Sequence, residues 1–176
     1  ADIEKNVGWC ENAFAKRGFT TKRLHTQTVP LLLAERNVKN AKKTVLSYLQ
    51  IDRQPVDPSK WEQESPWKPT LKEKNAEGKW ASIPFEKLQT ELKRDWRIFV
   101  RSASDAKGPA MAFIASLDAL AEIKREPNFN IKVIMDFEEE LGSPHLPDAV
   151  IKYKTELAAD MLIIFDGPRH VSNEPT

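Results

Sequence analysis

The stretch Asn130–Ser143, NIKVIMDFEEELGS, decides how the chain folds. Its first part is a short apolar run rich in β-branched residues, which predicts a strand buried on both faces of a sheet. Three consecutive acids, Glu138–Glu140, follow directly. Carboxylates beside a buried strand are costly unless something cationic lies near them. Two interpretations stay open: a solvated loop, or carboxylates presented to a ligand crevice at the C-terminal end of a core strand.

The segments on either side of this stretch alternate between strands and helices. Thr44–Ile51 and Asp160–Phe165 are apolar runs of strand length, and both are expected to be buried. Ala110–Lys124 has apolar residues at helical spacing, and Pro144–Leu157 is expected to form a second helix. This order predicts right-handed crossovers and parallel pairing. We therefore expect Thr44–Ile51, Asn130–Phe137 and Asp160–Phe165 to be neighbouring strands in one sheet that the two helices cover.

The first forty residues add a helix and two strands. Residues 2–17 have the apolar spacing of an amphipathic helix that ends near Gly18. Phe19–Thr28 is typical of a strand toward a sheet edge, and Leu31–Glu35 is a second strand. Adjacent strands of this kind favour a mixed sheet. The sequence therefore predicts an α/β fold with three layers, α/β/α, and a mixed, mainly parallel sheet.

Residues 54–96 form an excursion rich in proline and tryptophan. Proline at this density excludes long helices and central strands. A loop of this length inside a domain is usually functional or has local structure of its own. Its acids offset its lysines, which disfavours a nucleic-acid groove. The prolines and tryptophans are Pro55, Pro58, Trp61, Pro66, Trp67, Pro69, Trp80, Pro84 and Trp96.

Composition narrows the class of protein further. The chain has 176 residues, enough for one domain with a sizeable core, and a formal net charge of +1. A near-neutral charge gives no bulk attraction to nucleic acid or membrane, and no apolar run approaches the ~20 residues that span a bilayer. The only cysteine, Cys10, is expected to be a small buried hydrophobe. No signal-like N-terminus is present in the chain as given, and the compartment stays open between cytoplasm and periplasm.

Carboxylates recur where the predicted strands end. Asp52 follows Thr44–Ile51, Asp105 follows the brief apolar run 97–101, Glu139 and Glu140 follow the central strand, and Asp166 follows the last strand. Each one alone is typical of a turn or a helix cap. Parallel strands end on the same side of a sheet, so the five are expected to converge. Converging carboxylates repel unless a metal neutralises them, and oxygen-rich sets suit hard or borderline divalent ions.

Four motifs resemble those of a known family and occur in the same order. They are Gln54-Pro55-Val56-Asp57-Pro58, Ser104-Asp105-Ala106-Lys107-Gly108-Pro109, Glu139-Glu140-Leu141-Gly142-Ser143-Pro144 and Asp166-Gly167-Pro168-Arg169. The family is that of the co-catalytic zinc peptidases, which includes carnosinase-type dipeptidases, glutamate carboxypeptidases and succinyl-diaminopimelate desuccinylase. The resemblance covers roughly residues 44–176. It implies metal-dependent hydrolysis of a peptide or amide bond in dipeptides or short peptides, with two divalent ions, zinc or else manganese.

The resemblance also implies a role for each carboxylate. Asp105 is the aspartate that bridges two metals, and Glu140 and Asp166 are terminal ligands, one for each metal. Glu139 is the general base that takes a proton from the attacking water, and Asp52 orients a metal ligand. The chemistry is consistent, because two ions polarise the scissile carbonyl while an adjacent carboxylate moves the proton.

Three departures from the family pattern affect this expectation. Gln50 stands where the family usually has a histidine ligand, and an amide oxygen is a poorer zinc ligand than imidazole. Ala106 replaces a second aspartate, at little cost because Asp105 is the bridging one. The family's catalytic domain normally continues beyond the position of Thr176 and supplies a lid and dimerisation domain and a final histidine ligand.

We therefore expect residues 1–176 to be the N-terminal part of a catalytic domain that lacks its lid. Such a fragment is expected to be inactive alone, and the intact enzyme is expected to form a homodimer through the lid domain. The alternative is a non-catalytic relative that uses the fold for binding or assembly. The histidines do not repair the ligand set: His25 is expected to be structural, His145 to lie at a helix start and His170 in a terminal loop.

Overall fold

The computed structural model describes residues 2–166, which divide into two compact units. The described part of the first unit combines residues 2–52 with 105–166, and the second unit is Arg53–Ser104. The first unit contains the stretch Asn130–Ser143. No helix in the described part of the chain is long and apolar enough to cross a membrane.

The first unit is built on a five-stranded sheet with the strand order β1-β2-β7-β3-β8. β3 pairs in parallel with both β7 and β8, so the three strands expected to be neighbours are neighbours. β2 pairs antiparallel with both β1 and β7. The sheet is therefore mixed, but only two of its four pairings are parallel, because β1 and β2 join it as an antiparallel hairpin. The strands are β1 (Thr20–Leu24), β2 (Leu31–Arg36), β3 (Thr44–Gln50), β7 (Asn130–Asp136) and β8 (Met161–Ile164).

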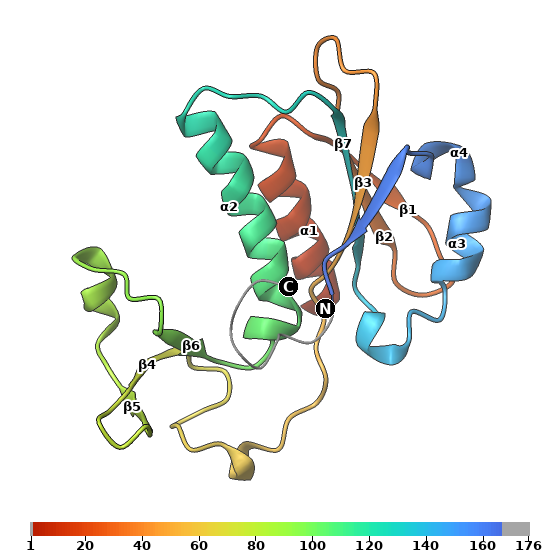
Figure 1. The fold of residues 1–176 in the computed structure, drawn as a ribbon. Coiled ribbons are helices and arrows are strands. Elements are labelled where there is room, and N and C mark those ends of the chain that lie inside the picture. The colour runs from red at the N-terminus through yellow and green to blue at the C-terminus, as the bar shows by residue number, and fades with distance from the viewer. Residues whose placement is uncertain (1, 167–176) are drawn as a thin grey trace. The chain divides into compact units, whose positions relative to one another are not determined.

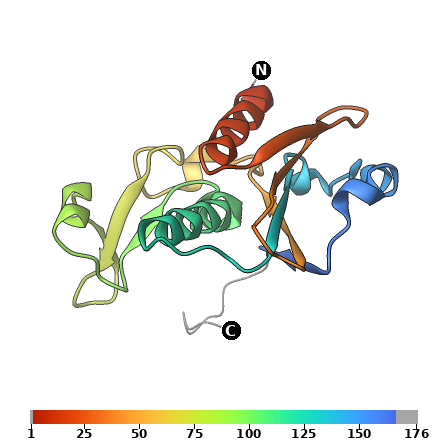
Figure 2. The ribbon, with the colours of Figure 1, turned by 90° about the horizontal axis from the view of Figure 1, so that it is seen from above.

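Helices cover both faces of this sheet and give the three expected layers. α1 (Asp2–Ala15) and α2 (Gly108–Glu122) lie on one face, and α3 (Leu146–Lys152) and α4 (Lys154–Leu157) lie on the other (Figures 1 and 2). Each face has its own apolar cluster, because alternate residues of a strand point to opposite sides. Val133 and Met135 pack with α1 and α2, whereas Ile134 packs with α3 and α4.

The N-terminal helix packs against the sheet through its buried face. Phe14 is fully buried and contacts Phe19 edge-on, with ring centroids 5.3 Å apart, and a tilted Phe113 from α2 at 6.5 Å. Cys10 lies in the same cluster, and burial raises the pKa of its thiol to about 12. The prediction that Cys10 is a buried hydrophobe is confirmed.

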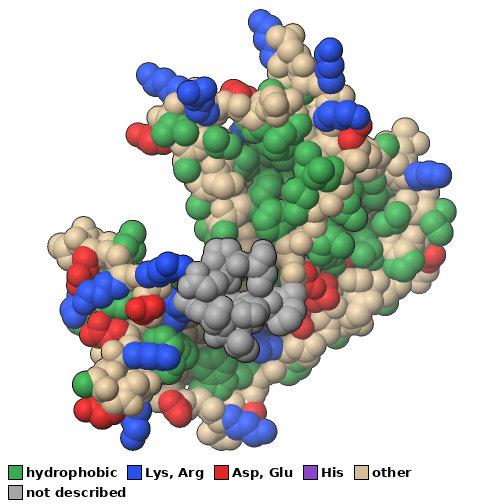
Figure 3. Space-filling view, in the orientation of Figure 1, with side chains coloured by type: hydrophobic (Ala, Val, Ile, Leu, Met, Phe, Trp, Pro, Cys, Tyr) green, Lys and Arg blue, Asp and Glu red, His purple; other side chains and the backbone are tan. Residues whose placement is uncertain are grey.

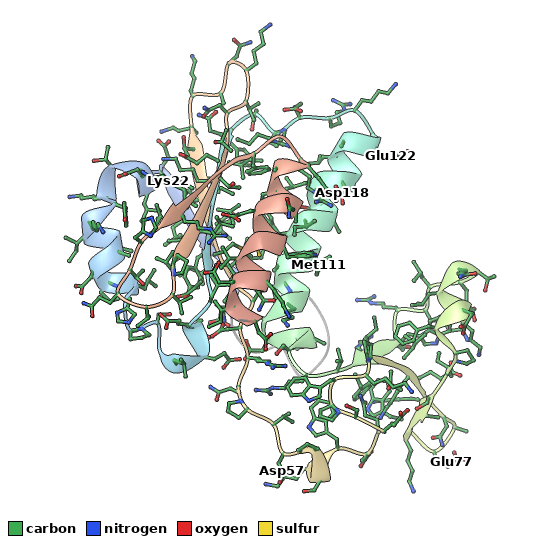
Figure 4. All side chains as sticks on the ribbon, turned by 180° about the vertical axis from the view of Figure 1, so that it is seen from behind. Lys22, Asp57, Glu77, Met111, Asp118 and Glu122 are labelled. Atoms are coloured by element: carbon green, nitrogen blue, oxygen red, sulfur yellow. The ribbon has the colours of Figure 1, made fainter. Side chains whose placement is uncertain are left out.

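Ion pairs link the elements at the surface of this unit. The Arg17 guanidinium, just after α1, donates two hydrogen bonds of 2.6 Å to the carboxylate of Asp118 on α2. Lys22 of the edge strand pairs with Glu156 of α4 at 3.0 Å. Figure 4 labels Asp118 on α2 and Lys22 on β1. Exposed pairs of this kind contribute little to stability, so the apolar clusters carry most of the packing.

Two expectations for the C-terminal part were wrong in detail. The helix predicted over Pro144–Leu157 is two short helices, because the backbone leaves helical geometry at Tyr153. The last strand is not buried: all four residues of β8 are exposed, from 39% for Ile163 to 58% for Ile164. In the described chain β8 is one of the two edge strands, the other being β1, and apolar side chains cover this region of the surface (Figure 3). Its composition correctly indicated a strand, but composition does not fix a strand's place in the sheet.

The second unit has local structure of its own. A three-stranded antiparallel sheet, in the order β5-β4-β6, is flanked by two short 3₁₀ helices. Its prolines lie outside the strands, which is why proline density and a small sheet coexist. Trp80 packs edge-on against Phe99, and the Trp96 indole N–H donates to the Glu73 carboxylate at 3.0 Å. The elements are η1 (Pro58–Lys60), β4 (Thr70–Lys74), β5 (Trp80–Ser82), η2 (Phe85–Gln89) and β6 (Arg97–Phe99).

Candidate functional site

The C-terminal ends of three parallel strands carry the candidate residues. Gln50, the last residue of β3, lies opposite Asp136, the last residue of β7. Asp52 follows β3 by two residues, and Asp166 follows β8 by two. Because the three strands run in parallel, their ends lie at one edge of the sheet, where open α/β sheets usually place ligands.

The glutamates after β7 lie in a tight turn, which we call the acidic turn and define as Glu138–Ser143. The Glu138 carbonyl accepts hydrogen bonds from the N–H groups of Leu141 (3.1 Å) and Ser143 (3.0 Å). The short helix η4 (Glu139–Leu141) lies inside this turn. Gly142 has a φ of +83°, a left-handed conformation that glycine adopts without steric cost. The turn therefore needs the Gly-Ser that follows the acids in the sequence.

Two carboxylates hold the backbone of the acidic turn. Asp136 accepts the Glu138 N–H on Oδ1 at 2.8 Å and the Ser143 hydroxyl on Oδ2 at 2.7 Å. The hydroxyl of Tyr48 donates to the same Oδ2 at 2.9 Å. Asp52 accepts the Glu140 N–H on its own Oδ2 at 2.9 Å. The middle and both ends of the turn are thus fixed to β3, β7 and the residues directly after β3.

The carboxylates predicted to converge lie within electrostatic range of Glu139. Burial raises the pKa of Glu139 most, and the negative charges of Asp166, Glu140, Asp52 and Asp105 raise it further. Three acids from three other segments, and the neighbouring Glu140, thus act on one glutamate. The arrangement stores electrostatic repulsion that a cation bound between these groups relieves.

Burial also raises the pKa of Asp52. Its hydrogen bond from the Glu140 N–H opposes the shift, and the charges of Asp136 and Glu140 add to it. The other carboxylate oxygen of Asp52, Oδ1, is buried and has no hydrogen-bond partner among residues 2–166.

Gln50 is the least satisfied polar side chain at this edge. The residue is 2% exposed, and within the described part of the chain neither its amide oxygen nor its amide nitrogen has a hydrogen-bond partner. A buried polar atom without a partner is destabilising by about 1–3 kcal/mol. Gln50 carries this cost at the position where the resemblance places a metal ligand. It therefore stays a candidate metal ligand.

Asp105 reaches the site from a different segment. It lies in η3 (Ala103–Lys107), an irregular turn whose backbone at Asp105 is extended (φ −115°, ψ 102°), directly before α2. The peptide bond between Asp105 and Ala106 is cis. Asp105 itself is exposed, whereas Ala106 is buried.

The fit of this site to metal ions is incomplete. Its candidate ligands are carboxylate and amide oxygens, which suit divalent ions, and the carboxylates act electrostatically on one another. Among residues 2–166, however, no group of three or more His, Cys, Asp or Glu side chains is arranged to hold a metal ion. His25 and His145 line a separate cavity of about 250 Å³, and His170 lies outside the described residues.

Three residues of this site, Asp136, Tyr48 and Ser143, were not predicted from the sequence. Asp136 lies within the quoted stretch, inside what reads as an apolar run. The sequence does contain a signal for Asp136: an acid inside a buried run needs hydrogen-bond donors close to it. The phenol that supplies one donor, on Tyr48, is two residues before Gln50 and therefore on the same face of β3.

Comparison with known proteins identifies relatives. A Beta-Ala-His dipeptidase from Homo sapiens is 30% identical over 140 residues, which are 78% of this chain and 23% of that protein. The Cys-Gly metallodipeptidase dug1 from Schizosaccharomyces pombe is 31% identical over 140 residues, 77% of this chain and 25% of that protein. The chain thus spans about a quarter of the length of these curated relatives. No family model matches the sequence.

A solved structure agrees with these relatives. The crystal structure of an M20 family metallo-carboxypeptidase, Sso-CP2 from Sulfolobus solfataricus, has a TM-score of 0.74 and 31% sequence identity to this chain. The match covers 98% of this chain and 34% of that one. Fold, identity and the resemblance noted in the sequence agree. The chain belongs to the M20 family of metallopeptidases, of the carnosine dipeptidase and Dug1 type, and spans at most about a third of its full-length relatives.

Proposed function

We propose that the whole protein hydrolyses a peptide or amide bond in dipeptides or short peptides, using divalent metal ions. The observation that carries this proposal is the convergence of Asp52, Asp105, Glu140 and Asp166 around Glu139 at the C-terminal edge of the sheet. Family membership supports the reaction class, since the relatives are named as dipeptidases and a metallo-carboxypeptidase. Residues 1–176 contribute one part of the site, and we expect no turnover from them alone.

Each carboxylate has a role in this proposal. Asp105, Glu140 and Asp166 would hold the ions, with Gln50 as a weaker fourth ligand, and zinc or manganese would supply the positive charge that polarises the scissile carbonyl. Glu139 accepts a proton from the attacking water and passes it to the leaving amine. Its raised pKa supports this role, because a general base works best when its pKa lies closer to neutral pH.

Asp52 has a positioning role in the proposed reaction. It accepts the Glu140 N–H and so holds the backbone of one proposed ligand. Its buried, unpartnered Oδ1 gives it capacity for a further donor.

A second function, in binding or assembly without catalysis, is favoured by two observations. Gln50 occupies a position where imidazole is expected, and residues 2–166 contain no ready group of three metal-binding side chains. The two functions differ in turnover. A catalytic protein hydrolyses peptides when metal is bound, whereas a binding protein does not hydrolyse them at all.

The deciding experiment uses the intact polypeptide from its source. Hydrolysis of β-Ala-His, Cys-Gly and a panel of other dipeptides is measured with and without a chelator, and the oligomeric state is measured by light scattering. We expect chelator-sensitive turnover, abolished by Glu139→Gln, in a homodimer. Glu138→Gln is the matched control, because the Glu138 carboxylate accepts the Thr28 hydroxyl at 3.0 Å and has no proposed role in the reaction. Metal-free protein without turnover on any peptide favours the binding function.

A further inference from the structure

Asp136 is a buried acid for which the proposed reaction has no role. It is the last residue of β7 and only 1% exposed. Its carboxylate accepts hydrogen bonds from the Tyr48 hydroxyl, the Ser143 hydroxyl and the Glu138 N–H, at 2.9, 2.7 and 2.8 Å. A buried carboxylate is tolerated only where donors of this kind surround it. The residues that supply these donors therefore show what Asp136 holds together.

The three donors come from three places. Glu138 begins the acidic turn, Ser143 ends it, and Tyr48 lies on the neighbouring strand β3. One side chain therefore closes the turn at both ends and attaches it to β3. A carboxylate suits this task because it has two oxygens and only accepts, so one group receives all three donors.

The closed turn carries Glu139 and Glu140 between its two fixed ends. Asp52 holds the middle of the same turn through the Glu140 N–H. Catalytic groups need supporting side chains that fix their geometry to within about half an ångström. The contacts of Asp136 fix the backbone on both sides of this pair and leave the two glutamate side chains at the sheet edge.

We propose that Asp136, acting with Tyr48 and Ser143, is the positioning residue that holds Glu139 and Glu140 in place at the site. The functional part of this statement rests on the proposed function, because it takes Glu139 and Glu140 as the working groups. The local part, that Asp136 fixes the acidic turn, does not rest on it. The two parts are therefore tested by separate measurements.

The first measurement is amide hydrogen exchange on the 176-residue chain. In Asp136→Ala the Glu138 amide loses its carboxylate acceptor and should exchange at least about tenfold faster, because loss of a charge-assisted hydrogen bond is worth about that factor or more. The Glu140 amide keeps Asp52 as its acceptor and should accelerate less, as the turn around it loosens. Amides in the middle of β7, such as Ile134, should change much less. Tyr48→Phe and Ser143→Ala each remove one hydroxyl and should give smaller changes in the same direction. They keep the test usable if Asp136→Ala fails to fold.

Asn130→Ala is the matched control for this measurement. Asn130 lies at the opposite end of β7, and its side-chain oxygen accepts the Val38 N–H at 2.9 Å. Losing that bond weakens the same strand without contacting the acidic turn. Two results would overturn the positioning role. One is equal exchange of the turn amides in Asp136→Ala and Asn130→Ala, and the other is a uniform acceleration of exchange along β7 and the turn.

The second measurement is Mn²⁺ affinity by calorimetry on the same variants. We expect Asp136→Ala and Asp136→Asn to bind Mn²⁺ several-fold more weakly than Asn130→Ala does. Equal affinity in all of them contradicts the functional part. If the unmodified chain takes up no Mn²⁺, the proposed metal site is what fails, and the exchange result still decides whether Asp136 positions the turn.

Discussion

Replacing Gln50 with methionine should stabilise the metal-free chain. Gln50 is 2% exposed, and neither amide atom has a partner in the described part of the protein. Methionine has a similar length and volume, so it fills the same space without polar atoms. An unsatisfied buried group costs about 1–3 kcal/mol, and the substitution removes that cost. The expected gain in unfolding free energy is therefore about 1–3 kcal/mol.

The assay is urea denaturation followed by far-UV circular dichroism at pH 7 with a chelator present. With an m-value of about 1–3 kcal/mol/M, a gain of about 1 kcal/mol raises the urea midpoint by about 0.3–1 M. Gln63→Met is the matched control, because the Gln63 amide donates to the carbonyls of Ser65, Lys68 and Phe99 at 2.9–3.1 Å. It should destabilise its own unit by about 1 kcal/mol.

The same substitution should weaken divalent-ion binding, because it removes an oxygen donor from the proposed site. A more stable protein that binds metal less well would explain why an unsatisfied buried amide is kept at this position. Unchanged or lower stability in Gln50→Met would refute the reasoning, because the amide would then be satisfied in solution.

Two further predictions concern the core and the pH dependence of stability. Phe14→Ala should lower the unfolding free energy by about 3–5 kcal/mol, because Phe14 is fully buried between two aromatic rings. Trp9→Ala is the control: its side chain is 48% exposed, and the substitution should cost far less in the same urea titration. The pKa of Glu139 is higher in the folded than in the unfolded chain, so its contribution to stability falls as the pH rises from the unfolded pKa through the folded one. Glu139→Gln should therefore stabilise the chain at pH 7 and lose that advantage near pH 4; an equal effect at both values would show that the Glu139 charge does not oppose folding.

The fold could be predicted from the sequence wherever a local pattern determines which strands pair. The β-branched run that became β7 and the helical spacing of α2 were enough to place β3, β7 and β8 side by side. Hairpin or crossover geometry fixes which strands are parallel, but nothing local shows which strand lies at an edge. That is why the exposure of β8 was not predicted from its apolar composition.

The site followed in part from the same logic. The convergence of Asp52, Glu140 and Asp166 on Glu139 is what parallel strands with acidic C-terminal ends produce, whereas Asp105 comes from the turn before α2. The contacts of Asp136 depend on the register that sets Gln50 opposite Asp136, and register is a long-range property. Tyr48 lies 88 residues before Asp136, a separation that no motif spans, whereas Ser143, 7 residues after Asp136, lies in the same quoted stretch.

The central claim is that the carboxylates at the sheet edge form a divalent-ion site that this chain only partly completes. Calorimetric titration of the 176-residue chain with Zn²⁺ and Mn²⁺ tests it most directly, because stoichiometry and affinity report the ligand set without requiring turnover. We predict weak binding that Glu140→Gln weakens further, that Glu138→Gln leaves unchanged and that Gln50→His tightens, since imidazole is the better ligand. Tight binding of two zinc ions by the unmodified chain, or binding that Glu140→Gln and Gln50→His leave unchanged, would contradict it.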